Sequence, residues 1–267
     1  MIELKQIDYK NELSDFINKK GEIDFFSLTL DINKFPTKVK FFKEKIVNYL
    51  KANKVVYIKR FGISKSEYIF LNRLISKDIY YSKRMGVYVH NFKIRMNAHD
   101  LSEEIKSGSF HTDFTFQNIS PDFISLQCIS PDPKYPYLGI NYLVSTQDIF
   151  NVLIEKFNFK AEYLLDISLP YTFDKITFWI KPFYLINNNI EMKIHLRYID
   201  RTKLNKDIIY LINLVEQVAM NLSKSITLNK GDVLLFSNKT LLHKRGECSI
   251  DLLNNQSREL NSIRFFI

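Results

Sequence analysis

The chain has little glycine and no long hydrophobic run, and both features exclude classes of protein. Seven of its 267 residues are glycine, and neither GxGxxG nor GxxxxGK[ST] occurs, so a glycine-built phosphate cradle is not expected. No apolar run reaches the length of about 18 residues that a membrane helix needs. The opening sequence MIELKQIDYKNELSDF lacks the apolar segment of a signal peptide. We therefore expect no membrane association.

Cysteine is also scarce, which bears on metal chemistry and on location. Cys128 and Cys248 are the two cysteines, and they form no CxxC pair of the kind that binds zinc. Cys128 lies in an apolar run, so a buried thiol is expected there. A reducing, cytoplasmic setting fits this usage.

The charge is strongly positive but not concentrated. Lys and Arg number 38 against 29 Asp and Glu, a net charge of +9. The lysines are scattered, and the run from Lys38 to Lys45 has the spacing of a solvated helix face. The expected partner is therefore a small molecule rather than nucleic acid. Nothing in the sequence indicates the oligomeric state.

The hydrophobic pattern predicts a mainly β protein with flanking helices. Hydrophobic residues make up 46% of the chain, and its length suits one domain over residues 1–267. We expect a helix and strand cover over 1–80 and a cupin-like jelly-roll core with helical insertions over 81–267. Helices are expected near 37–53, 66–77, 146–157 and 203–223. Strands are expected near 55–59, 88–95, 122–129, 139–144, 232–236, 240–244 and 262–267, with a hairpin of 176–186 and 190–198 around the asparagines 187–189.

Three residues have the chemistry of a non-heme iron site. His111 and Asp113 are separated by one residue, so on a strand both side chains would share a face, and Thr112 would point away. His243 lies on a distant predicted strand that Gly231 and Asp232 introduce. Two imidazoles and one carboxylate form the facial triad that holds Fe(II) and leaves positions open.

The remaining histidines have a structural interpretation. His90 and His195 lie in strand-like runs and are expected to pack or to form hydrogen bonds, and His99 lies in a predicted loop. An HxD pair also occurs often by chance, so the triad needs support from the rest of the sequence.

Two late arginines provide that support. Arg258 and Arg264 have the same parity, so they share a face of one extended strand. An arginine fork grips a carboxylate through two hydrogen bonds. One of the two would hold the far carboxylate of a 2-oxo acid, with Arg258 favoured, and the other an acidic group of the substrate. The alternative is a surface ion pair with Glu247 or Glu259.

Four segments together resemble one enzyme family. HTDFTF at 111–116 resembles its metal-binding signature, and PDFISLQCISPDP at 121–133 resembles the strand and turn that follow. GDVLLFSNKTLLHKRG at 231–246 is the most specific match, and VVYIKRFG at 55–62 resembles an N-terminal strand. The chain is thus similar to Fe(II)/2-oxoglutarate oxygenases of the taurine dioxygenase superfamily, and within it to the clavaminate synthase-like branch of amino-acid hydroxylases.

The resemblance implies a double-stranded β-helix and a set of roles. His111, Asp113 and His243 would be the metal ligands and the catalytic residues. Fe(II), 2-oxoglutarate and O2 would be the cofactors, with Arg258 on the far carboxylate of 2-oxoglutarate and Asn141 beside it; Arg264 is the other candidate for that carboxylate. The implied reaction is hydroxylation of an unactivated C–H bond in a free amino acid or an amino-acid-derived acid, with release of succinate and CO2. Asp113 favours oxygenation over halogenation, because a halogenase needs a small residue there.

The substrate contacts are less defined. Each candidate also has a structural interpretation, as a packing or ion-pairing residue. The candidates are Arg95, Phe114, Phe116, Gln127, Arg197, Asp200 and Arg264.

Other functions stay open at this stage. The same cofactors could support desaturation, cyclisation or isonitrile formation in natural-product biosynthesis. A jelly-roll binding protein without catalysis is a further alternative, although the intact triad argues against it. A contiguous basic groove beside the metal would instead favour action on nucleic acid or on a protein side chain.

Overall fold

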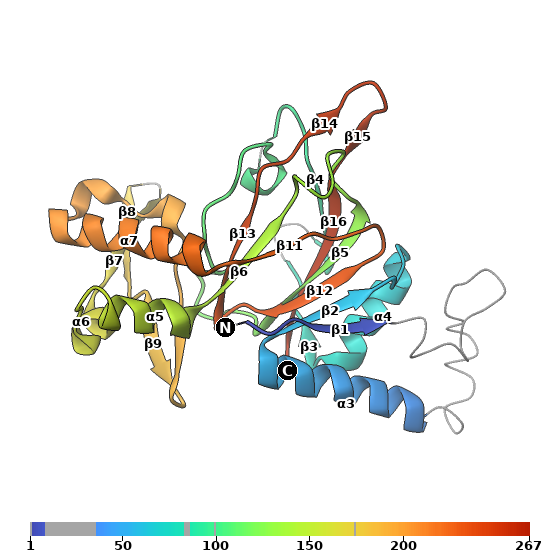
Figure 1. The fold of residues 1–267 in the computed structure, drawn as a ribbon, viewed down its shortest axis with the longest axis horizontal. Helices are drawn as coiled ribbons and strands as arrows, with labels where there is room; N and C mark the ends of the chain where they lie inside the picture. The colour runs from blue at the N-terminus through green and yellow to red at the C-terminus, as the bar shows by residue number, and fades with distance from the viewer. Residues whose placement is uncertain (1, 9–35, 83–85, 99, 174) are drawn as a thin grey trace.

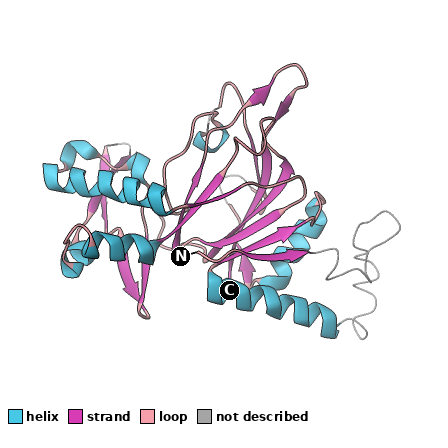
Figure 2. Ribbon diagram, viewed as in Figure 1, coloured by secondary structure: helices cyan, strands magenta, loops and turns pink. Residues whose placement is uncertain are grey.

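The computed structural model describes residues 2–8, 36–82, 86–98, 100–173 and 175–267. Among them, the predicted mixture of many short strands and a few helices is confirmed (Figures 1 and 2). The α-helices are α3 Pro36–Asn53, α4 Lys65–Ile75, α5 Thr146–Glu155, α6 Ala161–Asp166 and α7 Lys206–Leu222, and the 3-10 helices are η2 Leu101–Glu103, η3 Leu196–Tyr198 and η4 Arg201–Lys203. The strands are β1 Lys5–Asp8, β2 Val55–Lys59, β3 Asp78–Ile79, β4 His90–Lys93, β5 Phe123–Ser130, β6 Asn141–Ser145, β7 Leu169–Phe173, β8 Ile176–Ile180, β9 Phe183–Ile186, β10 Asn189–Met192, β11 Lys224–Ile226, β12 Val233–Ser237, β13 Leu241–Arg245, β14 Ile250–Asp251, β15 Gln256–Ser257 and β16 Glu259–Phe266.

Two sheets form the centre of the molecule. The larger has seven strands in the order β1-β2-β12-β5-β16-β3, with β4 also paired to β16. The smaller has the order β11-β6-β13. Their facing sides enclose an apolar core, to which the large sheet contributes Leu234 and Phe236 and the small sheet contributes Leu143 and Leu241. Alternation along each strand sends the intervening residues to the outer faces.

Helices α3 and α4 cover the outer face of the large sheet (Figure 1). Ile46 and Leu50 of α3 pack there against Val56 and Ile58 of β2. The Ser64 side chain caps α4 by accepting a hydrogen bond from the Glu67 N–H, as the serine near this position predicts. The two N-terminal helices thus cover the large sheet, and the strands β1 and β2 are themselves members of that sheet.

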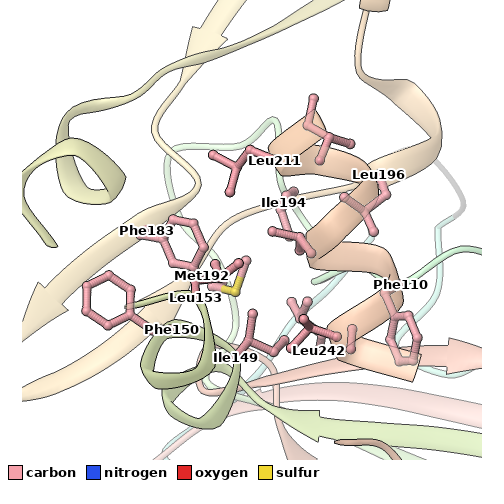
Figure 3. Packing of buried hydrophobic residues seen from close by; sticks show 14 of the residues in the cluster. Phe110, Ile149, Phe150, Leu153, Phe183, Met192, Ile194, Leu196, Leu211 and Leu242 are labelled. Atoms are coloured by element: carbon pink, nitrogen blue, oxygen red, sulfur yellow. The ribbon is translucent and has the colours of Figure 1, made fainter. Parts of the chain in front are cut away.

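A second helical layer lies on the outer face of the small sheet. Leu242 of β13 packs there with Ile149 and Leu153 of α5 and with Leu211 of α7, and Figure 3 shows these side chains gathered between the two helices. Burying an aliphatic side chain of this size contributes about 1.5–3 kcal/mol. The layer order is therefore α3 and α4, large sheet, small sheet, then α5 and α7.

The region from 169 to 198 differs from the sequence prediction. The run expected as one strand over 176–186 is divided into two strands, because Pro182 has no N–H for a continuous ladder. β8 pairs with β7, and β9 pairs with β10. The predicted turn is confirmed at Asn187 and Asn188, whose φ angles are 48° and 62°, values that suit a two-residue hairpin. The partner strand ends at Met192, and the chain then continues through η3.

Both cysteines are free and buried. The buried thiol predicted at Cys128 is thereby confirmed, and burial raises its pKa to about 12. Among the helices of the described residues, none has the length and apolarity required to cross a membrane.

Candidate metal centre

Three histidines stand in one row across neighbouring segments. His111 and His243 exchange both backbone N–H···O hydrogen bonds, each 3.0 Å long, and His195 forms a bridge on the other side of His111. Residues paired directly across antiparallel segments place their side chains close together on one face. The ring centroid of His111 lies 4.1 Å from that of His243 and 4.7 Å from that of His195. Backbone pairing thus brings together residues that are far apart in the sequence.

Asp113 reaches the same face through a turn. The strand expected over the HxD segment is reduced to one residue, His111, which is bridged to His195 and to His243. Phe114, after Asp113, has a φ of 64°. The Thr112 side chain is buried, and its Oγ1 accepts a hydrogen bond from the Ile194 N–H. A turn at this point places the carboxylate beside the imidazoles.

A buried amide fixes the backbone of Asp113. The Asn238 Oδ1 accepts a hydrogen bond from the Asp113 N–H at 2.7 Å, and its Nδ2 donates to the Asp113 carbonyl at 3.0 Å. The same Nδ2 also lies within hydrogen-bond distance of Ser120 Oγ and the Pro121 carbonyl. Asn238 is 1% exposed. It therefore ties the metal-site turn to the loop before β5.

The three candidate ligands meet at one point. Oδ1 of Asp113 lies 3.5 Å from the Nε2 atoms of both His111 and His243, and the three ligand atoms all lie within 4.8 Å of one another. Metal bonds of about 2.1 Å at right angles place ligand atoms about 3 Å apart. The donor set therefore fits a divalent ion.

The protonation state also suits metal binding. The Nδ1 of His111 lies 2.9 Å from the Ser109 carbonyl, which can only accept, so Nδ1 carries the proton and Nε2 keeps its lone pair. Burial, reinforced by His111, lowers the pKa of His243 to about 4. Burial opposes the ionisation of Asp113, but Arg264 and the two histidines outweigh it and hold its pKa well below the usual value. At neutral pH His243 is thus a neutral imidazole and Asp113 a carboxylate, the states that a metal requires.

A cavity of about 680 Å³ opens beside these residues. It is lined by all three candidate ligands and by Asn141, Arg258 and Arg264. Both arginines therefore face the same space, as their parity predicts.

The two arginines have different partners. Arg258 is 6% exposed, and its Nη2 donates to Asn141 Oδ1 at 2.7 Å. Arg264 Nε donates instead to Asp113 Oδ2 at 2.9 Å. Neither forms the predicted alternative of a surface ion pair with Glu247 or Glu259 within the described residues.

Asn141 has both ends of its amide in use. Its Oδ1 accepts from Arg258, and its Nδ2 donates to the Ile226 carbonyl at 3.2 Å. The Nδ2 has a second proton, so it can donate to 2-oxoglutarate, as the sequence suggests, while the Ile226 bond is kept. In this arrangement Asn141 also orients the guanidinium of Arg258.

Besides Arg264, three of the predicted substrate residues line the cavity. Phe114 packs edge-on against Tyr80, and Phe116 contacts the rings of Tyr171, Phe173 and Tyr198. Arg197 lines the cavity too, and its Nη1 lies 3.3 Å from Glu104 Oε2. These side chains form an aromatic wall with one paired charge.

The other three predicted residues are not in the cavity wall. Gln127 donates to the Gly62 carbonyl and accepts from Asn261, so its amide is used between strands. Arg95 is mostly exposed and faces Glu103. Asp200 caps η4 and accepts from Thr172. Sequence position identified the strand of Gln127 but not the direction of its side chain.

Sequence reasoning missed two residues of this centre. His195 was expected to pack or to form hydrogen bonds, yet it lines the cavity beside His111, and burial together with His111 lowers its pKa to about 3. Its place in the row depends on strand register, which the sequence does not show. Asn238 lies inside the 231–246 segment that carries the resemblance, so that signal could have found it. His90 lines the cavity as well, and His99 lies outside the described residues.

The comparisons with known proteins bear on the fold. No protein-family model matches the sequence, and no curated protein matches it significantly. Solved structures do match. An asparagine oxygenase in complex with Fe(II), 2S,3S-3-hydroxyasparagine and succinate has a TM-score of 0.75 at 9% identity, over 98% of this chain and 93% of that one.

Two further structures extend the comparison. The non-heme iron oxygenase OrfP, in complex with Fe and alpha-ketoglutaric acid, has a TM-score of 0.68 at 13% identity, over 100% of this chain and 94% of that one. A taurine dioxygenase from Burkholderia xenovorans has a TM-score of 0.62 at 12% identity, over 86% and 81%. The chain has the fold of non-heme iron oxygenases. The resemblance predicted from the sequence motifs is thereby confirmed at the level of the fold.

Proposed function

We propose that this protein is an Fe(II)- and 2-oxoglutarate-dependent oxygenase that hydroxylates an unactivated C–H bond of a small molecule. The observation that carries the proposal is the convergence of His111, Asp113 and His243 at the wall of a cavity that also contains Arg258. Asparagine oxygenase and OrfP, which share the fold, are bound to hydroxylated amino acids in their crystals. A free amino acid or an amino-acid-derived acid is therefore the proposed substrate, with succinate and CO2 as the other products.

The roles of the residues follow from their chemistry. His111 Nε2, His243 Nε2 and Asp113 Oδ1 would hold Fe(II), which when bound with 2-oxoglutarate activates O2 for C–H oxidation. Arg258 would bind the far carboxylate of 2-oxoglutarate, because its charge is buried and meets no carboxylate among the described residues within ion-pair distance. Asn141 holds that guanidinium in place. The aromatic wall of Phe114 and Phe116 would limit water beside the reacting bond.

The wider predictions belong to this proposal. We propose that the two sheets form the double-stranded β-helix of a jelly roll and that residues 1–267 are one domain, with 1–80 as the cover and 81–267 as the core. A cytoplasmic location and a role in natural-product biosynthesis are likewise proposed. Desaturation, cyclisation and isonitrile formation use the same ligands and are outcomes that product analysis would separate.

One spectroscopic experiment tests the metal and co-substrate together. Anaerobic addition of Fe(II) and 2-oxoglutarate should produce a visible charge-transfer band. The band should be absent from His111→Ala. In Arg258→Ala a higher concentration of 2-oxoglutarate should be needed to reach half of the maximal absorbance. Arg95→Ala is the matched control, since it removes an exposed arginine outside the cavity wall, and it should titrate like the wild type. Absence of the band from folded wild-type protein would contradict the proposal and favour a non-catalytic binding protein.

A second experiment tests the substrate class. Succinate release should be measured with a panel of free amino acids under air, with 2-oxoglutarate alone as the background. At least one amino acid should raise the rate above that background. If the charge-transfer band forms but no amino acid raises the rate, the free-amino-acid assignment is wrong and a carrier-bound substrate becomes the better hypothesis.

A further inference from the structure

The two carboxylate oxygens of Asp113 have separate partners. Oδ1 faces the Nε2 atoms of His111 and His243, each at 3.5 Å. Oδ2 accepts a hydrogen bond from Arg264 Nε at 2.9 Å. We propose that Arg264 is a positioning residue for the metal ligand: it holds Oδ2 so that Asp113 can give the metal only one oxygen. This inference rests on the proposed metal centre and assigns Arg264 a role other than binding 2-oxoglutarate or a substrate acid.

Both members of this ion pair are held in place. The side chains of Arg264 and Asp113 are 12% and 17% exposed. The Arg264 guanidinium lies over the Phe92 ring of β4, with its central carbon 5.5 Å from the ring centroid, a cation–π contact. Asn238 holds the backbone of Asp113 from the opposite element. The contact between Nε and Oδ2 thus joins two rigid segments.

Arg258 provides the contrast. Its Nη2 meets a neutral amide oxygen of Asn141, and within the described residues no carboxylate lies in ion-pair distance. Arg264 already forms an ion pair with Asp113, whereas Arg258 has no carboxylate partner among the described residues. The geometry therefore separates the two arginines that the sequence left open, with Arg258 for an incoming carboxylate and Arg264 for the metal ligand.

The number of coordination positions gives this role its consequence. Two histidines and one carboxylate oxygen use three of the positions of a six-coordinate ion and leave about three open. A carboxylate bound through both oxygens would leave about two. Chelation by a 2-oxo acid requires two positions and O2 requires one, so an Asp113 bound through both oxygens would leave no place for O2.

The test counts exchangeable waters on bound Mn(II), used as the probe without 2-oxoglutarate, by water-proton relaxation. Affinity alone is a poor test, because loss of a positive charge favours a cation while loss of positioning opposes it. The wild type should hold about three waters. Arg264→Met should hold about two, because Oδ2 becomes free to bind. Arg258→Met is the matched control, because it makes the same arginine-to-methionine substitution at the other arginine of the cavity. Its bound Mn(II) should keep three waters.

A second background separates positioning from general damage. In Asp113→Ala the carboxylate is absent, so adding Arg264→Met should leave the water count unchanged. A lower count in that background as well would mean that the substitution disturbs the site as a whole, which overturns the inference. Arg264→Gln, smaller and polar, replaces Arg264→Met if the latter does not fold, and circular dichroism checks every variant.

The Arg264 Nη1 is buried without a hydrogen-bond partner among the described residues, so 2-oxoglutarate binding is measured as well. With Mn(II) bound, Arg258→Met should lower the affinity for 2-oxoglutarate by tenfold or more. If Arg264→Met keeps three waters on Mn(II) and lowers the affinity for 2-oxoglutarate as much as Arg258→Met does, Arg264 holds the co-substrate and the inference is wrong. If the wild type fails to bind Mn(II), the metal centre itself is wrong, which is a different result.

Discussion

The buried amide of Asn238 provides the sharpest test of how the site is built. Replacing it by alanine removes the acceptor for the Asp113 N–H and the donor for three oxygens, those of Asp113, Ser120 and Pro121. A net hydrogen bond contributes about 1 kcal/mol, and a buried group left without a partner costs about 1–3 kcal/mol. Because Nδ2 has two protons for three acceptors, the expected loss is about 3 kcal/mol.

The loss should be visible in a thermal melt. For a chain of this size 1 kcal/mol corresponds to about 2–4 °C, so Asn238→Ala should melt about 6–12 °C below the wild type. Mn(II) affinity should fall about 10- to 100-fold as well, because the Asp113 turn loses its support. The matched control is Asn151→Ala, whose amide accepts a hydrogen bond from Gln147 on an exposed helix face. It should change stability by less than about 0.5 kcal/mol.

A third variant separates the two halves of the amide. Asn238→Asp keeps the acceptor for the Asp113 N–H but places an oxygen against the carbonyls that Nδ2 now meets. It should therefore destabilise the protein at least as much as Asn238→Ala. If Asn238→Ala melts within 2 °C of the wild type and binds Mn(II) equally well, the reasoning is refuted, and Asp113 must be held by other contacts.

The other predictions concern one glycine and one core residue. Gly139 has a φ of +70°, and an added Cβ would lie 2.8 Å from Asp132 Cβ and 2.9 Å from Arg258 Cδ. Gly139→Ala should therefore displace both side chains and weaken the binding of 2-oxoglutarate to the Mn(II)-loaded enzyme by tenfold or more. Gly86→Ala has a similar φ of +65°, but its Cβ would lie 3.7 Å from Tyr81 Oη, an ordinary contact distance. It should share the backbone strain and keep normal 2-oxoglutarate binding, and equal losses in both variants would contradict the clash. Leu153 of α5 is fully buried in the cluster that α5 forms with α7. Leu153→Ala should therefore lower the free energy of unfolding by about 2–5 kcal/mol, measured in a thermal melt. Leu253→Ala, at a site 97% exposed, should cost almost nothing, and a Leu153→Ala melt as high as that control would show that this layer is not a packed core.

Local elements were accessible from the sequence because local chemistry decides them. The apolar periodicity of residues 37–53 predicts α3, and a serine at 64 or 66 indicates the start of α4, where the structure selects Ser64. The asparagines at 187–188 predict the hairpin turn, since their side chains tolerate positive φ. The prediction of one strand over 176–186 was wrong, because alternation alone does not tell with which neighbour a strand pairs. Pro182 marked the break, and its effect depends on the neighbouring ladder.

The sequence by itself determined the chemistry of the candidate site. Two imidazoles and a carboxylate specify the kind of ion, and two arginines of equal parity specify an anion-binding face, because these properties belong to the residues themselves. Tertiary structure decided the geometry. It placed His195 in the histidine row, turned the Gln127 amide away from the cavity, and gave Arg258 and Arg264 different partners. Register and turn geometry fix these features, and both depend on contacts between segments that are 65 to 151 residues apart.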